Sequence, residues 1–211
     1  GWRPDVGLTF DREQHLYALD GQPLPSVTQI LEATGVCDYS YLPPATRRMA
    51  LGRGSAVHSA TQFDDEGDLD EAGLDDELVP YLSAWRRFRA ETGFTPDLIE
   101  YQDWHRTYRY AGTLDRRGVF PDGSKAILDI KTNSSEGWVR LQLAAYADFF
   151  PDTRTYRRIC VEVRKDTTYR VIEFPAAHHT ADFGRFLACL TVYRLQQEHG
   201  RLAVKQERKI A

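Results

Sequence analysis

The sequence predicts an α/β protein of the α+β type, in which helices flank a central mixed β-sheet. The 211 residues are 42% hydrophobic and 12% aromatic, which is enough to build a sizeable core. Helix-like apolar stripes and strand-like runs follow one another in the order helices, three strands, helix, two strands, helix. Such an order is typical of one sheet with helices packed against it.

Residues 1–95 are predicted to form a mostly helical lobe packed on the rest of the chain. It opens with a small hairpin over residues 7–26, and Ser26 can cap a short helix over residues 27–34. A second helix is expected over residues 43–63, after two prolines. A third carries an apolar stripe at helical spacing, made of Leu78, Tyr81, Leu82, Trp85 and Phe88.

Residues 96–211 are predicted to hold the sheet. Pro121 and Gly123 supply the turn between two of its strands, because Pro fixes φ and Gly permits a positive φ. The five strands are expected over residues 97–105, 107–120, 125–132, 156–166 and 168–174, and the helices over 137–150 and 181–199.

Composition excludes several classes of protein. The formal net charge of −4 does not indicate a strongly basic nucleic-acid binder, which leaves only a local basic patch for such contacts. Cys37, Cys160 and Cys189 are odd in number and far apart, so we expect a reducing, intracellular and cytoplasmic setting without a four-cysteine metal site. No apolar stretch approaches the length of a membrane span, and no membrane partner is expected.

Three charged residues lie on two strands that otherwise look like core. Asp129 and Lys131 alternate with Leu128 and Ile130, so they share one face of their strand, and Asp115 lies across the turn. Two carboxylates that converge need a cation, and Mg²⁺ or Mn²⁺ prefers such oxygen ligands. The alternative is an ordinary salt-bridged strand pair at a sheet edge.

Four motifs, in this order along the chain, relate these two strands to a known protein superfamily. "RGSAVH", "GTLD", "ILDIKT" and "QLAAY" together resemble the PD-(D/E)XK nuclease superfamily, and within it the RecB-like exonuclease branch. The resemblance runs from about residue 24 to 165. The four-cysteine iron–sulfur clasp of some members is absent, which favours the clasp-free phage-borne and mitochondrial-type exonucleases. The resemblance implies a restriction-endonuclease-like core and cleavage of DNA with Mg²⁺ or Mn²⁺.

The resemblance also assigns roles to the charged residues. Asp115 and Asp129 correspond to metal ligands, and Lys131 corresponds to the catalytic lysine. His58 corresponds to a further ligand or a phosphate contact, and the backbone carbonyl of Ile130 is positioned to add a ligand. Taken alone, His58 would more often be an ordinary helix histidine.

Supporting residues are expected on the neighbouring elements. Gln142 and Tyr146 are four residues apart, so they share one helix face, and the resemblance has both reaching the metal site or the DNA backbone. Glu100 is a candidate for holding a metal-bound water from outside the ligand shell, or for pairing with a nearby arginine. Without the resemblance, Gln142 would read as a surface residue, and Tyr146 as a packing residue with its hydroxyl in water.

DNA contact is assigned to basic and aromatic residues near the motifs. Arg53 and Arg140 lie nearest to them and are predicted to bind substrate phosphates, together with Tyr146. Tyr108, Tyr110 and Trp138 are candidates for stacking on unpaired bases.

The sequence therefore supports the hypothesis of a metal-dependent DNA exonuclease acting at DNA ends or in single strands. A role in recombination, repair or phage DNA processing follows from the resemblance alone. Two alternatives stay open: a structure-selective or restriction-type endonuclease of the same superfamily, and a catalytically silent nucleic-acid-binding subunit.

Overall fold

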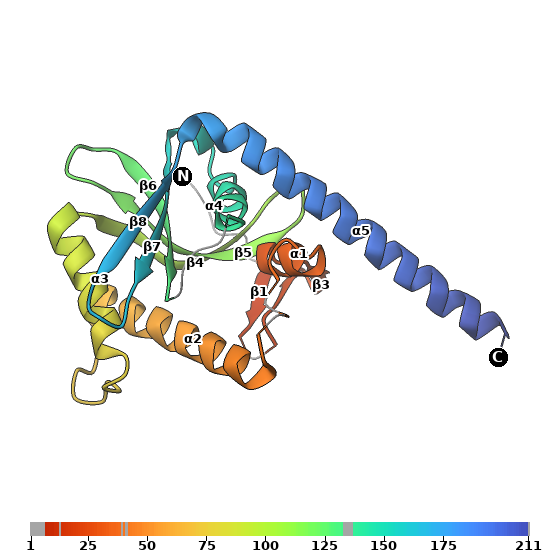
Figure 1. Ribbon diagram of the computed structural model, residues 1–211. Helices are drawn as coiled ribbons and strands as arrows, with labels where there is room; N and C mark the ends of the chain where they lie inside the picture. The colour runs from red at the N-terminus through yellow and green to blue at the C-terminus, as the bar shows by residue number, and fades with distance from the viewer. Residues whose placement is uncertain (1–6, 13, 39, 41, 133–136, 211) are drawn as a thin grey trace.

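The protein, seen in a computed structural model, is built around a five-stranded sheet (Figure 1). Residues 7–12, 14–38, 40, 42–132 and 137–210 are described, with side chains up to residue 200. All neighbouring strands are antiparallel except β6 and β7, which are joined by the crossover helix α4. The strands lie in chain order: β4 (Thr95–Trp104), β5 (Ala111–Val119), β6 (Lys125–Lys131), β7 (Arg157–Val163) and β8 (Tyr169–Phe174). The predicted α+β class is confirmed.

Helices cover both faces of this sheet. The helices α1 (Val27–Ala33), α4 (Val139–Ala147) and α5 (His179–Ile210) share one core with Ile127 of β6. The helices α2 (Pro44–Glu66) and α3 (Val79–Thr92) share the other core with residues 126, 128 and 130 of that strand. Asp129 therefore faces α4, because successive side chains of a strand point to opposite faces.

A second, smaller sheet precedes α1. Its strands β1 (Leu8–Asp11), β2 (Leu16–Leu19) and β3 (Gln22–Leu24) are all antiparallel, so the predicted hairpin gains a third strand. Ser26 caps α1 as predicted, since its hydroxyl accepts from the Gln29 amide and the Gln29 side chain accepts from the Ser26 amide. The boundary predicted at residue 95 falls where β4 begins, and the division into a lobe and a core stays a prediction.

The last helix is much longer than its apolar stripe indicated. We expected it over residues 181–199, but α5 runs from His179 to Ile210 and extends well beyond the body of the protein (Figure 1). The stripe predicts only the part that packs, whereas good helix formers carry the helix onward. Across the described residues, no helix combines the length and apolar character needed to cross a bilayer.

A carboxylate fastens α4 to its neighbours. His105 Nε2 donates to Asp148 Oδ2 at 2.9 Å, and His179 Nε2 lies 3.4 Å from the other carboxylate oxygen. Partial burial raises the pKa of Asp148, but the two histidine contacts outweigh it and lower the pKa from 3.8 to about 2.

This depressed pKa predicts acid sensitivity. Because the folded state holds Asp148 deprotonated more readily than the unfolded chain does, its contribution to stability is complete above a pH of about 4 and is lost as the pH falls through about 2. Urea unfolding of the wild type and of Asp148→Asn should therefore differ most at about pH 6, and the difference should shrink below about pH 4. A constant difference over that range would contradict this role.

Candidate metal centre and active site

The site forms where β5 and β6 part. Backbone pairing of the two strands runs from Val119 and Lys125 to Arg116 and Leu128. One residue beyond that last pair, the Asp115 carboxylate takes the place of a backbone partner, because its Oδ2 accepts from the Ile130 amide at 2.6 Å. The parting of the strands thus brings a buried carboxylate, 6% exposed as a residue, against the backbone of β6.

His58 reaches this point from α2. Its Nε2 donates to the Ile130 carbonyl at 2.9 Å, while Nδ1 lies 3.4 Å from Glu100 Oε1 and 3.6 Å from Asp115 Oδ2. The structure therefore brings together His58, Asp115 and the Ile130 carbonyl, as the sequence predicted.

Glu100 completes the group. One ligand atom from each of His58, Glu100 and Asp115 lies within 4.8 Å of the others; we call these three residues the His–Glu–Asp cluster. Glu100 has a φ of 44°, in the left-handed region that a non-glycine residue rarely adopts within a strand. Backbone strain of this kind is found disproportionately at functional sites.

Asp129 and Lys131 lie beside the cluster as an ion pair. Lys131 Nζ is 2.8 Å from each Asp129 carboxylate oxygen and donates a hydrogen bond to Oδ1. Asp129 is 1% exposed. Among the described residues, its Oδ2 has the ionic contact with Lys131 but accepts no hydrogen bond. The predicted ligand Asp129 is thus engaged by Lys131, while Glu100, expected outside the ligand shell, stands in the compact group.

The two predicted residues of α4 reach the same place. Lys131 Nζ donates to Gln142 Oε1 at 3.4 Å, and Gln142 Nε2 donates to the Tyr146 hydroxyl at 3.3 Å. Both residues are buried, so Gln142 is not a surface residue, and the Tyr146 hydroxyl accepts from Gln142 instead of lying in water. Gly112 makes the close approach of α4 possible, because a Cβ there would lie 2.5 Å from the Tyr146 ring.

Burial and mutual repulsion shape the charges. Burial lowers the pKa of His58, but the Asp115 and Glu100 carboxylates outweigh it and raise the pKa to about 9. Burial likewise raises the pKa of Asp115 and of Asp129 above the ordinary value, despite the nearby cations His58 and Lys131. A protonated His58 thus supplies the positive charge that the acids require, and it must lose its proton before either ring nitrogen can bind a metal.

The donor set fits a divalent cation. Three acids of the site, Glu100, Asp115 and Asp129, gather in partly or fully buried positions, and Asp129 Oδ2 makes only an ionic contact, with Lys131 Nζ. Carboxylate and carbonyl oxygens suit Mg²⁺ and Mn²⁺, and an imidazole nitrogen suits a transition metal such as Mn²⁺ better than Mg²⁺. His58, Asp115, Asp129 and the Ile130 carbonyl, with Glu100, are the residues that would hold the ion.

Arg116, a buried arginine that the sequence did not assign to the site, holds one of its carboxylates in place. Arg116 is fully buried and donates to Asp65 Oδ2 at 2.6 Å, to Glu100 Oε1 at 2.9 Å and to Thr61 Oγ1 at 3.1 Å. It thereby ties α2 to β4 and orients one carboxylate of the cluster. An arginine directly after Asp115 in a core-like strand was the available signal.

The residues predicted to contact substrate differ in their exposure and in their partners. Arg140 of α4 forms an ion pair with Asp182, and Arg53 is half-buried on α2. Tyr110 is fully buried and donates to the Ala145 carbonyl, so its proposed stacking on bases is wrong. Trp138 is only 6% exposed and packs against Lys131, with Nζ 5.4 Å from the ring centre.

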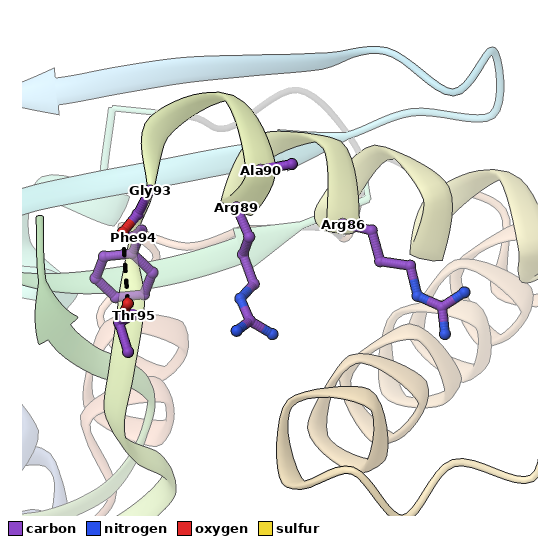
Figure 2. Close-up of a pocket in the computed structure, with 6 residues that line it drawn as sticks. All are labelled: Arg86, Arg89, Ala90, Gly93, Phe94 and Thr95. Carbon is purple, nitrogen blue, oxygen red and sulfur yellow. Dashed lines mark hydrogen bonds between the residues drawn. The ribbon is translucent and has the colours of Figure 1, made fainter. Parts of the chain in front are cut away.

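A pocket of about 310 Å³ lies elsewhere, at the end of α3 and the start of β4 (Figure 2). Arg86 pairs there with Asp64 and Glu71, and Arg89 pairs with Asp65. The carboxylates thus match the arginines in charge, and the pocket holds none of the predicted site residues.

Glu100→Gln tests whether the glutamate belongs to the metal centre. We expect it to weaken Mn²⁺ binding by about 10- to 100-fold, because it removes a charged oxygen from the cluster. Calorimetric titration measures this, with Glu91→Gln on the exposed face of α3 as the control. Unchanged Mn²⁺ affinity would mean that Glu100 serves only as a partner of Arg116.

No protein-family model matches the chain, and no curated protein matches it. The candidate chemistry therefore rests on the geometry of the site and on the motif resemblance.

Proposed function

We propose that the protein is a metal-dependent deoxyribonuclease, an exonuclease that hydrolyses phosphodiester bonds at DNA ends or in single strands. The observation that carries this proposal is the group of charged side chains that meets where β5 and β6 part. A His–Glu–Asp cluster suited to a divalent cation stands next to a buried carboxylate paired with an accessible lysine. The resemblance to the RecB-like exonucleases, based on the four ordered motifs, supports the same conclusion.

Each group has a part in the proposed reaction. A bound Mg²⁺ or Mn²⁺ would polarise the phosphate and activate water. Lys131, whose side chain is 23% exposed, stabilises the negative charge that develops on the phosphate oxygens or orients the attacking water. Gln142 accepts a hydrogen bond from Lys131 and so holds the ammonium group in place. Tyr146 holds Gln142 in turn.

We propose an intracellular, cytoplasmic setting, with recombination, repair or phage DNA processing as the context. Cys37, Cys160 and Cys189 form no disulfide with one another, which suits a reducing compartment. The context itself rests on the motif resemblance.

Digestion of end-labelled single- and double-stranded DNA tests the activity. We expect shortening of the labelled strands with Mg²⁺ or Mn²⁺ and none with a chelator. A covalently closed circle separates the exonuclease from an endonuclease, because an enzyme that needs ends leaves the circle intact. If no DNA is cut while Mn²⁺ still binds in a calorimeter, the nuclease proposal fails.

A further inference from the structure

A second pocket lies on the α4 side of the sheet, near the active site. It has a volume of about 280 Å³ and combines an indole wall, apolar groups and two guanidinium groups. We call it the α4–α5 pocket; its lining residues are Val36, Gly137, Trp138, Arg140, Leu141 and Arg185.

Among the residues that the structure describes, this pocket carries an excess of positive charge. Asp182 is fully buried and already pairs with Arg158, which is also fully buried, at 3.0 Å. Arg140 and Arg185 then share the other carboxylate oxygen, so three arginines face one acid and leave two positive charges uncompensated within this group. The side chains of Arg140 and Arg185 are 35% and 60% exposed, so both remain accessible to a ligand.

The pocket of Figure 2 has no such surplus of positive charge among the described residues. There, Arg86, Arg89 and the buried Arg116 share three carboxylates, those of Asp64, Asp65 and Glu71, so no positive charge is left over. Arginine side chains thus line both pockets, but only the α4–α5 pocket has the surplus charge that an anion requires.

The α4–α5 pocket is also next to the reactive lysine. Trp138 lines the pocket, and the same ring packs 5.4 Å from Lys131 Nζ. The Trp138 ring therefore borders both the pocket and the group proposed to act on the scissile phosphate. A strand with a phosphate at Lys131 is expected to run alongside the pocket.

We infer that the α4–α5 pocket binds the backbone phosphates of a single nucleic-acid strand next to the scissile phosphate, through Arg140 and Arg185. This inference rests on the proposed function for the position of the scissile phosphate. It adds Arg185 as a substrate-binding residue and assigns Arg140 to the same subsite. The planar guanidinium group suits this role, because it donates two parallel hydrogen bonds to a phosphate.

The test measures binding without cleavage. A short fluorescein-labelled single-stranded DNA is titrated with protein in the presence of a chelator, at several salt concentrations, and its anisotropy is recorded. For Arg140→Gln/Arg185→Gln we expect affinity at low salt to fall by about tenfold or more, because two charged contacts are lost. The slope of log K against log salt should become shallower by about 1.4, since each phosphate contact to a single strand contributes about 0.7.

Two further variants make the test decisive. Arg87→Gln removes the same charge from an exposed residue of α3, on the opposite side of the sheet, and should leave affinity and slope unchanged. Arg185→Gln alone changes the more exposed of the two side chains and should show about half of the change in slope while keeping the wild-type melting temperature.

The outcomes separate the two proposals. If the double variant and the wild type bind with the same affinity and slope, the pocket inference is overturned even when the protein cleaves DNA. A wild type that does not bind single-stranded DNA overturns it as well. A selective loss in the double variant supports the pocket even when no cleavage is found with Mg²⁺ or Mn²⁺, and in that case only the nuclease proposal fails.

Discussion

Lys131→Ala is expected to lower the rate of metal-dependent DNA cleavage by about 10²- to 10⁴-fold, the usual loss when a proton-transfer group or a charge-stabilising donor is removed. The ammonium group lies at 2.8 Å from Asp129 and within reach of Gln142, on the side of β6 that faces α4. No other described lysine or arginine contacts these two side chains, so nothing is placed to substitute for it.

Single-turnover cleavage of labelled DNA with saturating Mn²⁺ measures this effect. Lys125→Ala serves as the matched control, because Lys125 lies on the same strand at its opposite end and is half exposed. Calorimetry should show that Lys131→Ala still binds Mn²⁺, since the lysine is not a ligand and its loss frees Asp129. Cleavage by Lys131→Ala at the wild-type rate would remove the lysine from the mechanism.

Arg116→Ala should destabilise the fold by about 3–5 kcal/mol, the usual cost of removing one partner of a buried ion pair. Arg116 and Asp65 both have fully buried side chains and lie 2.6 Å apart. The substitution leaves the Asp65 carboxylate with Arg89, whose side chain is 30% exposed, as its remaining charged partner. It also removes the hydrogen bond that orients Glu100, and Mn²⁺ binding should weaken with stability.

Chemical denaturation of the variant measures the loss. Arg87→Ala is the control, because Arg87 and Glu91 form an exposed i,i+4 pair of the kind worth about 0.3–0.5 kcal/mol. Replacing both members of the buried pair, Asp65→Asn with Arg116→Met, should recover part of the loss, since no buried charge is then left alone. Equal effects of Arg116→Ala and Arg87→Ala would show that the buried pair contributes little.

Local patterns predicted the elements of the large sheet well. The alternation around Asp129 placed Leu128 and Ile130 on one face, and both are indeed in the core shared with α2 and α3. The pattern could not reveal the third strand of the small sheet, because residues 8–11 become a strand only by pairing with β2. Nor could it locate the end of α5, since a helix that does not pack needs no apolar stripe.

The residues that meet at the candidate site were predictable from the spacing on the hairpin and from the motif resemblance, which alone pointed to His58. His58, Asp115, Asp129 and Lys131 come together as their motifs indicated. Two features depend on tertiary structure instead. Glu100 has a positive φ inside a strand, and because the residue is not a glycine, the sequence gives no sign of it. The partnership of Arg116 with Asp65 joins residues that are 51 positions apart in the chain.

The bond between the Ile130 amide and the Asp115 carboxylate has a practical consequence. Most amide hydrogens of a sheet are held by carbonyl groups, and their exchange with deuterium reports the opening of strands. The Ile130 hydrogen is held by a side chain of the proposed active centre instead. Its exchange rate therefore reports, without any attached probe, whether that carboxylate keeps its hydrogen bond or turns toward an arriving ion.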